Sequence, residues 1–287
     1  MLLKKRNMSL KVFDCHIHVG FCEGVVAKKE KDFFVSVEEV INYLDQNGIQ
    51  KALIFPFPNP RISIREANRY IAQCIEKEKR RLYGLFYFSC NENLKELSEF
   101  AGSKIVGIKI HPSFSKRSIV ELPNALLKIV RDNKWILLVD SSISNIGHPA
   151  HVVEFARKNR DIPIICAHMA RIFHKEVLEI AELDNVYIDV SGICLLSADS
   201  HRLAPLDLRH ISLRENFSPR NILEYLLRFI GKERLVWGSD FPFPQIFGQR
   251  LDSEINFILR DAPSFLSRGV HQNILNDNME LLLTKNK

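Results

Sequence analysis

The sequence predicts an α/β fold, a (β/α)8 TIM barrel that forms a single domain over residues 1–287, with residues 1–10 as an extension without fixed structure. Short apolar runs typical of strands alternate with segments of helical periodicity along the whole chain. The run at residues 135–139 is apolar throughout, as expected of a parallel strand that is buried on both faces. A chain of 287 residues also suits one barrel, which needs about 250 residues.

The expected strands and helices follow one another in a regular order. The strands cover residues 12–18, 51–55, 82–88, 105–110, 135–139, 162–167, 186–190 and 234–238. Ser36 and Glu39 form a capping box that predicts a helix from there to about residue 48. Later helices are expected at residues 65–81, 94–100, 122–132, 151–159, 174–183 and 219–230, with two more after residue 242. Residues 20–32 predict a polar loop, and residues 191–215 an irregular segment long enough to indicate a functional loop.

The first expected strand carries two histidines that are one residue apart. Side chains alternate across a strand, so His16 and His18 should leave the same face and share one metal ion. Asp14 has the same parity and is expected to orient the two histidines through hydrogen bonds. Two histidines on a strand also fit a purely structural role, so the prediction depends on further ligands.

Further candidates follow other expected strands: His111 after the fourth, Asp140 after the fifth, His168 after the sixth and Asp240 after the eighth. The active site of a barrel is built from these strand ends. Each residue alone has a structural alternative, such as a capping role for Asp240, but one shared site explains all of them. Imidazole and carboxylate ligands around an open position suit a divalent metal, with zinc favoured and manganese or iron as alternatives. The predicted metal ligands are His16, His18, Asp140, His168 and Asp240. Asp240 is predicted to accept the proton of a water molecule, and His168 to polarise the substrate carbonyl.

The composition restricts the class of partner and the compartment. A formal charge of +6 and a pI near 9.0 suit a solvated basic surface or binding of an anionic small molecule. We expect neither nucleic acid nor a membrane as a partner. The composition is also compatible with a homodimer. The sequence contains no run of 18 apolar residues and no apolar stretch suited to a signal peptide after Met1. The six cysteines (residues 15, 22, 74, 90, 166 and 194) form no Cys-x-x-Cys pair, which indicates reduced thiols and a cytoplasmic location.

Several of these motifs occur together in one known family. They are Asp14-x-His16-x-His18, the Ala67-Asn68 helix leading to Arg81-Leu82-Tyr83-Gly84, Gly107-Ile108-Lys109-Ile110-His111-Pro112, Ala167-His168, Gly238-Ser239-Asp240-Phe241-Pro242 and Ile274-Leu275-Asn276-Asp277-Asn278. In this order the chain resembles the amidohydrolase superfamily and, within it, amidohydrolase family 2. The resemblance implies a metal-dependent hydrolase, or one of the decarboxylases and lactonases that share the fold, and it places Asp240 beside the metal.

Two positions depart from the family pattern. Members usually carry a histidine at the end of strand five, where this chain has Asp140, and many have glycines after the strand-six histidine, where this chain has Met169-Ala170-Arg171. Asp140 can still bind a metal, but its negative charge favours a harder or more tightly held cation. In some relatives elsewhere in the superfamily, strand four carries a carboxylated lysine that bridges two metals. For Lys109 a place in the polar upper layer of the barrel is the simpler interpretation.

The residues expected to bind substrate are His111, Lys109, Arg202 and Arg209. The two arginines belong to the long loop after strand seven, which should lie over the same face of the barrel. Guanidinium groups match planar carboxylates and phosphates, so the sequence predicts a small-molecule substrate that can be anionic. A charged loop that is simply solvated is the alternative.

Four functions compete at this point. The leading hypothesis is hydrolysis of a small amide, ester or lactone, and the second keeps the metal but removes CO2 from a small aromatic or unsaturated carboxylic acid. The opening motif also resembles metal-dependent DNases, but those enzymes normally present a glutamate after strand four, where Lys109 and His111 stand here. A catalytically degenerate barrel with a binding role is the alternative of another class, suggested by Asp140 in the fifth strand.

Overall fold

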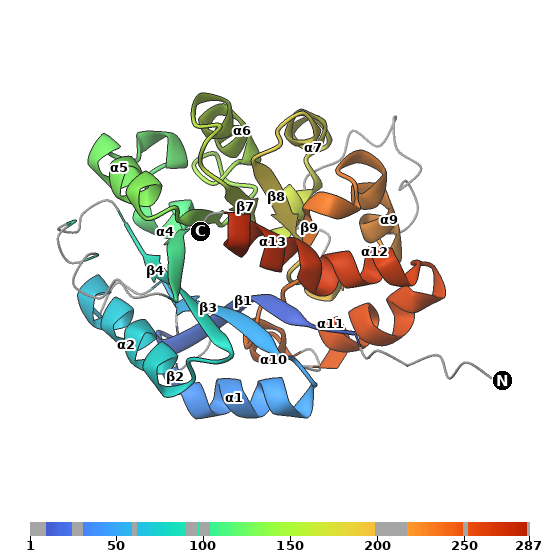
Figure 1. Ribbon diagram of the computed structural model, residues 1–287, viewed down its shortest axis with the longest axis horizontal. Coiled ribbons are helices and arrows are strands. Elements are labelled where there is room, and N and C mark those ends of the chain that lie inside the picture. Colours follow the sequence, from blue (N-terminus) through green and yellow to red (C-terminus); the bar gives the residue numbers. More distant parts are fainter. Residues whose placement is uncertain are drawn as a thin grey trace.

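The computed structural model describes residues 10–24, 31–58, 62–89, 94, 97, 104–198, 217–248 and 252–285. Its centre is a nine-stranded sheet in which all neighbours except β2 and β1 pair in parallel and in chain order (Figure 1). The parallel strands are β1 (Phe13–Cys22), β3 (Lys51–Pro56), β4 (Leu82–Tyr87), β5 (Ile105–Ile110), β6 (Ile136–Val139), β7 (Ile164–Cys166), β8 (Val186–Asp189) and β9 (Leu235–Val236). The strand β2 (Phe33–Val35) pairs antiparallel with the last three residues of β1.

The sheet closes on itself through the residues that follow β9. The Cys15 amide donates to the Trp237 carbonyl at 3.0 Å, and the His18 amide donates to the Phe241 carbonyl at 2.8 Å. Ile17 also forms a parallel bridge with Phe241. These contacts join the first strand to the last, and the predicted (β/α)8 barrel is confirmed.

Helices cover the outside of the barrel between successive strands (Figure 1). The α-helices are α1 (Val37–Gln46), α2 (Ile64–Lys77), α4 (Pro112–Ser115), α5 (Asn124–Asp132), α6 (Pro149–Lys158), α7 (His174–Ala181), α8 (Ile193–Ala198), α9 (Pro219–Phe229), α10 (Phe243–Ile246), α11 (Asp252–Asn256), α12 (Arg268–Gln272) and α13 (Asn278–Lys285). Short 3-10 turns are η1 (Ile119–Glu121), η2 (His168–Ile172), η5 (Lys232–Arg234) and η7 (Ala262–Ser264), and π-helical turns are η6 (Phe257–Asp261) and η8 (Asn273–Asp277). The capping box predicted at Ser36 and Glu39 is confirmed at the start of α1.

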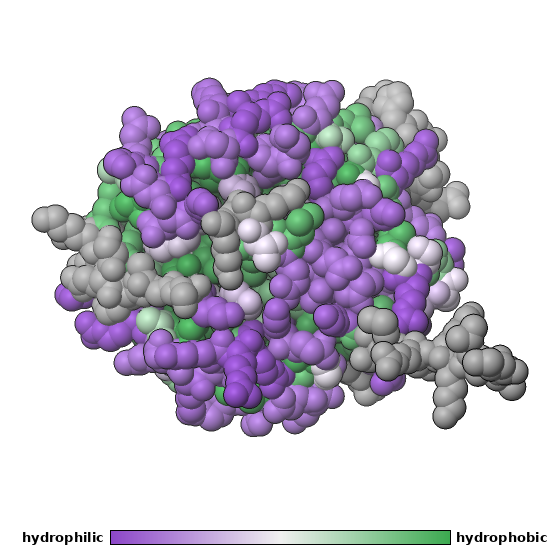
Figure 2. Space-filling view, viewed as in Figure 1, coloured by the Kyte–Doolittle hydropathy of each residue, from purple (hydrophilic) through white to green (hydrophobic). Residues whose placement is uncertain are grey.

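One end of the barrel is closed by the last helix. Inward-facing strand residues such as Phe13 and Tyr83 form one apolar cluster with Met279, Leu282 and Leu283 of α13. Figure 1 shows α13 across the middle of this end, and hydrophilic side chains predominate over the described part of the same face in Figure 2. The carboxyl-terminal ends of the strands therefore remain as the place for a site.

Two predicted loops differ from the structure. β1 continues to Cys22 because Gly20, Phe21 and Cys22 pair with β2, so the loop predicted from residue 20 was wrong at its start. Residues 25–30 of that loop lie outside the described residues. The segment predicted to be irregular from residue 191 contains the helix α8. The buried carboxyl group of Glu254 in α11 accepts a hydrogen bond from an amide of α8, and no local sequence pattern indicates this contact.

Smaller differences concern element ends. Arg234 lies in η5 rather than in the last strand, because its guanidinium donates to the carbonyls of Ile180 and Leu183 on α7 and the turn after it. The helix predicted at residues 94–100 lies mostly outside the described residues, and Leu94 and Leu97 are helical. Within the described ranges, none of the helices has both the length and the apolar character needed to cross a bilayer.

Candidate metal and substrate site

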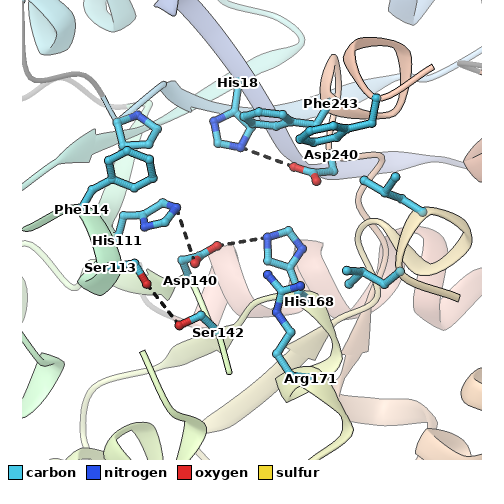
Figure 3. A pocket seen from close by; sticks show the side chains of 14 residues that line it. His18, His111, Ser113, Phe114, Asp140, Ser142, His168, Arg171, Asp240 and Phe243 are labelled. Atoms are coloured by element: carbon cyan, nitrogen blue, oxygen red, sulfur yellow. Dashed lines mark hydrogen bonds and ion pairs between the residues drawn. The ribbon is translucent and has the colours of Figure 1, made fainter. Parts of the chain in front are cut away.

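A cavity of about 260 Å³ lies at the carboxyl-terminal ends of the barrel strands (Figure 3). Its lining residues come from β1, from the segments that follow the other strands and from α8 and α10: His18, Pro58, His111, Ser113, Phe114, Asp140, Ser142, His168, Arg171, Leu195, Leu196, Asp240, Phe243 and Phe247. All four candidates predicted after later strands line this cavity together with His18. His16 is fully buried and lies against His18 and His168, with ring centroids 5.3 and 4.9 Å apart.

A β-bulge in β1 aims the two histidines. The register with β3 shifts between Asp14 and Ile17, so that one extra residue of β1 faces its partner strand. Cys15 belongs to the interior cluster and Ile17 to the cluster beneath the helices, which places both Cys15 and His16 on the inward side. Gly238 accommodates the bulge, because a Cβ there would lie 2.4 Å from the Cβ of His16. His16 and His18 therefore share the inner face, as predicted.

The bulge also separates Asp14 from the histidine rings, so the prediction that Asp14 orients them was wrong. Its carboxylate instead accepts from the amides of His16 at 3.1 Å and Ser239 at 2.9 Å, and from the Tyr43 hydroxyl of α1 at 3.1 Å. Burial raises the pKa of Asp14 to about 6, although hydrogen bonds from Ser239, His16 and Tyr43 oppose the shift. Asp14 thus ties the backbone of the first strand to that of the last.

Asp189, at the end of β8, performs the orienting role. Its Oδ2 lies 2.7 Å from His16 Nδ1, and its Oδ1 accepts from the amides of His168 at 2.9 Å and Ser191 at 3.0 Å and from the Ser191 hydroxyl at 2.5 Å. Burial opposes ionisation, but the electrostatic attraction of His16 and its hydrogen bond outweigh burial and hold the pKa of Asp189 well below its usual range. Sequence analysis missed this residue, although a lone carboxylate at the end of an apolar strand is the same pattern that identified Asp140.

The orientation of these groups suits a cation. The ligand atoms of His16, His168 and Asp240 all lie within 4.8 Å of one another. Because Asp189 engages His16 Nδ1, and burial lowers the pKa of His16, the Nε2 atom presents a lone pair. It lies 3.5 Å from Asp240 Oδ1, and neither atom has a hydrogen-bond partner among the described residues. Two acceptors that face each other in a buried site fit a metal ion between them.

The remaining predicted ligands adjoin this group. His18 Nε2 lies 3.4 Å from Asp240 Oδ1, and burial lowers the pKa of His18 to about 3. Asp140 lies between two histidines, with Oδ1 3.1 Å from His168 Nε2 and Oδ2 3.5 Å from His111 Nε2 (Figure 3). Burial opposes ionisation of Asp140, but the electrostatic attraction of His111 and the hydrogen bond with His168 outweigh burial and hold the pKa of Asp140 well below the usual range. The five predicted ligands thus form one contiguous cluster.

Residues His168 to Ile172 form a left-handed turn, with φ between 49° and 60° at all five positions. This conformation costs about 1–2 kcal/mol per non-glycine residue, so surrounding contacts must hold it. Arg171 Nε donates to the Ser141 carbonyl at 2.7 Å, and the side chains of Met169 and Ala170 are buried. The turn directs both His168 and Arg171 into the cavity (Figure 3). Arg171 was not among the predicted site residues, since no sequence feature indicated this turn.

The predicted substrate-binding residues fall in different places. His111 lines the cavity, and burial lowers its pKa to about 4. Lys109 points into the barrel interior, where its Nζ lies 4.6 Å from the centroid of the Phe55 ring and lacks a hydrogen-bond partner in the described part of the chain. Burial lowers the pKa of Lys109, although the charges of three site aspartates oppose the shift. Arg202 and Arg209 lie outside the described residues.

Comparison with solved structures shows the same fold in enzymes of several kinds. A probable 2-pyrone-4,6-dicarboxylic acid hydrolase from Acinetobacter baumannii, solved with citric acid bound, is 18% identical, with 96% of this chain and 100% of that chain covered and a TM-score of 0.70. An amidohydrolase from Burkholderia multivorans with bound zinc is 15% identical, with 96% and 99% covered and a TM-score of 0.66. A 2,6-dihydroxybenzoate decarboxylase from Rhizobium is 12% identical, with 97% and 100% covered and a TM-score of 0.67.

At the sequence level no curated protein matches the chain. The family model of the amidohydrolases, Amidohydro_2, matches residues 55–282, which include the end of β3, all of β4 to β9 and every predicted site residue except His16 and His18. Because this match spans most of the chain and the barrel brings the remaining two histidines to the same cavity, the protein belongs to the amidohydrolase family.

Proposed function

We propose that the protein is a metal-dependent hydrolase of a small amide, ester or lactone that carries an anionic group. The family is metal-dependent, and the observation that carries the proposal is the cluster of His16, His168 and Asp240 beside a cavity. Within it, His16 Nε2 and Asp240 Oδ1 lack a hydrogen-bond partner in the described part of the chain. A divalent cation, zinc by preference, would be held by His16, His18, His168 and Asp240, and when bound it would polarise a carbonyl and lower the pKa of water. We assign His168 to the cation because its ligand atom lies with those of His16 and Asp240.

In this proposal Asp240 is the general base. Its Oδ1 faces His16 and His18, which leaves Oδ2 to receive a proton from the attacking water. Burial opposes ionisation, but the contact with His18 and the electrostatic attraction of His168 and His16 outweigh burial and lower the pKa of Asp240, so it is a carboxylate at neutral pH. Asp240 has φ of 59°, a left-handed conformation that aspartate tolerates and that turns the chain out of β9.

The walls of the cavity support a substrate with one anionic and one apolar part. Arg171, Ser113 and Ser142 lie on one side, where the two serine hydroxyls are 3.1 Å apart (Figure 3). A guanidinium with neighbouring hydroxyls suits a carboxylate or phosphate. Leu195, Leu196 and two phenylalanines of the α10 segment supply apolar lining. We therefore give Arg171 the anion-binding role that the sequence had suggested for Arg202 and Arg209.

Loss of CO2 from an aromatic or unsaturated carboxylic acid is the second candidate. The rings of Phe114, Phe243 and Phe247 line the cavity and are suited to a planar substrate. The TM-score to a decarboxylase from Rhizobium, 0.67, lies between those to the pyrone dicarboxylic acid hydrolase, 0.70, and the zinc-bound amidohydrolase, 0.66. Measurement of CO2 release from benzoate derivatives, beside hydrolysis of lactones and 4-nitrophenyl esters, separates the two reactions.

Substitution of Asp240 tests the leading proposal. Asp240→Asn keeps the size of the side chain but removes its charge, so the zinc-loaded variant should retain its fold and much of its metal and lose on the order of 10²-fold or more in kcat. Zinc content is measured by elemental analysis and kcat on the best ester or lactone found for the parent. Asp184→Asn, an exposed aspartate after α7, is the control and should change neither quantity. Near-normal turnover by Asp240→Asn would exclude it as the base and move that role to Asp140.

A further inference from the structure

Glu254 of α11 is a buried acid that the proposed mechanism does not use. Its side chain is completely buried, and its Oε1 accepts from the amides of Cys194 and Leu195, both at 2.9 Å. These amides belong to the first turn of α8, a helix of six residues that has few hydrogen bonds of its own. One carboxyl oxygen thus holds the start of α8 from a helix about 60 residues further along the chain.

α8 occupies a position that controls the shape of the cavity. It follows Ser191 and Gly192 directly. The Ser191 hydroxyl donates a hydrogen bond to Asp189, and Gly192 lies beside Asp240, since a Cβ at Gly192 would be 3.6 Å from Asp240 Oδ2. Its residues Leu195 and Leu196 line the cavity. α11 follows β9 and Asp240, so the contact between Glu254 and α8 joins the two sides of the site. A shift of α8 beyond Gly192 would move the apolar wall, whereas Asp189 still holds His16 Nδ1, the His168 amide and Ser191, whose hydroxyl lies 3.1 Å from His168 Nδ1.

We infer that Glu254 is a positioning residue that clamps α8 and thereby fixes the apolar wall of the cavity, which sets selectivity for the apolar part of the substrate. The selectivity rests on the proposed function, whereas the clamp does not. Burial raises the pKa of Glu254 to about 8, opposed by hydrogen bonds from Leu195 and Cys194, so the group is largely a neutral acid at pH 7. Glutamine is then its close mimic, because an amide oxygen can accept from the same two amides.

Hydrogen exchange of the zinc-loaded protein tests the clamp without a substrate. Glu254→Ala should raise the exchange rate in peptides covering residues 193–198 by tenfold or more, and Glu254→Gln should keep it within about twofold of the parent. Zinc affinity should change by less than about threefold in both variants. Asn278→Ala is the control, since this buried side chain also donates two hydrogen bonds, to the carbonyls of Lys232 and Leu235 at 2.6 and 2.7 Å, but near the start of β9. Unchanged exchange in Glu254→Ala, or an equal rise in Asn278→Ala, overturns the clamp.

Kinetics with two esters test the selectivity. For 4-nitrophenyl hexanoate, Glu254→Ala should raise KM by about tenfold with kcat within threefold, while KM for 4-nitrophenyl acetate should stay within twofold because its acyl group is too short to need the wall. Glu254→Gln should restore the parent values. Equal changes for both esters, or a loss confined to kcat, contradicts the assignment. If the parent hydrolyses neither ester, the proposed hydrolase function loses support, whereas exchange and zinc binding still decide the clamp.

Discussion

At the scale of single residues, the site depends on carboxylates that do not touch the cavity. Asp189 is completely buried and contacts His16, the His168 amide and Ser191 at once. A carboxylate at Nδ1 fixes the tautomer of a histidine and leaves Nε2 for a ligand, and it also raises the basicity of the ring. Asp14 contributes in another way, by holding the backbone of His16 and Ser239 together.

Asp189→Asn separates the orienting role from a merely structural one. The amide has one acceptor oxygen where the carboxylate has two, so either the His16 contact or the contacts with the His168 and Ser191 amides must be lost. Zinc affinity should fall by about 10- to 100-fold, the usual effect of removing a partner that orients a ligand. The measurement is a competition titration with a chelator, with circular dichroism as a check on folding. A folded variant with parental zinc affinity would show that His16 needs no such partner.

At the scale of elements, the left-handed turn η2 determines what faces the cavity after β7. Five consecutive positive φ values carry the chain from His168 to Ile172, and the turn is held by Asp189 from one side and by the Ser141 carbonyl through Arg171 from the other. The glycines that many relatives have here would adopt this path without strain. This chain has residues with side chains instead, and one of them, Arg171, places its guanidinium group at the cavity wall.

The strain in η2 can be measured at Ala170. Ala170→Gly relieves about 1–2 kcal/mol of left-handed strain, but it loses a buried methyl worth about 0.8 kcal/mol and adds backbone entropy to the unfolded chain. Stability should therefore change by less than about 1 kcal/mol. Ala170→Val should lose about 2 kcal/mol or more, since a branched side chain disfavours positive φ and overfills the core.

Urea denaturation gives both values. Ala156→Gly, at a completely buried alanine in the right-handed helix α6, is the matched control and should lose about 1.5 kcal/mol. A loss at Ala170→Gly as large as that at Ala156→Gly would mean that the turn carries no strain.

At the scale of the whole molecule, long-range contacts assemble the site around the barrel. The first strand closes on the last through Cys15, His18 and the carboxylate of Asp14, and α13 fills the opposite end. α11 then reaches back to α8 through Glu254. The buried acid that makes this contact also makes the stability of the protein depend on pH.

The pH dependence follows from the raised pKa of Glu254. The pKa is about 8 in the folded protein and near 4.5 otherwise, so the folded state holds a proton that the unfolded state releases. Stability from this group is complete below pH 4.5 and is lost as the pH rises through about 8. The stability of Glu254→Gln relative to the parent should therefore increase with pH over this interval, by at most about 1.4 kcal/mol per unit, and level off above it. Urea denaturation of both proteins from pH 5 to 9 checks this, and a constant difference would reject the shift.

Much of the architecture could be predicted because it depends on local patterns. Apolar runs marked the eight barrel strands, Ser36 and Glu39 marked the start of α1, and the position of each polar residue after an apolar run placed His18, His111, Asp140, His168 and Asp240 at one end of the barrel. Parallel strands bring their carboxyl ends together whatever the helices between them contain. The metal and substrate roles of these residues remain predictions for the experiments above.

By itself the sequence determined the barrel, its family and the residue types gathered at its mouth, since strand periodicity and strand ends are properties of neighbouring residues. Only the tertiary structure decided that a bulge turns Asp14 away from the histidines, that Asp189 orients His16, that a left-handed turn delivers Arg171 and that Glu254 holds α8. Each of these depends on a contact between segments far apart in the chain, or on backbone strain that such contacts sustain. A local pattern can mark a residue such as Asp189 at the end of a strand, but it does not show which distant residue that side chain contacts.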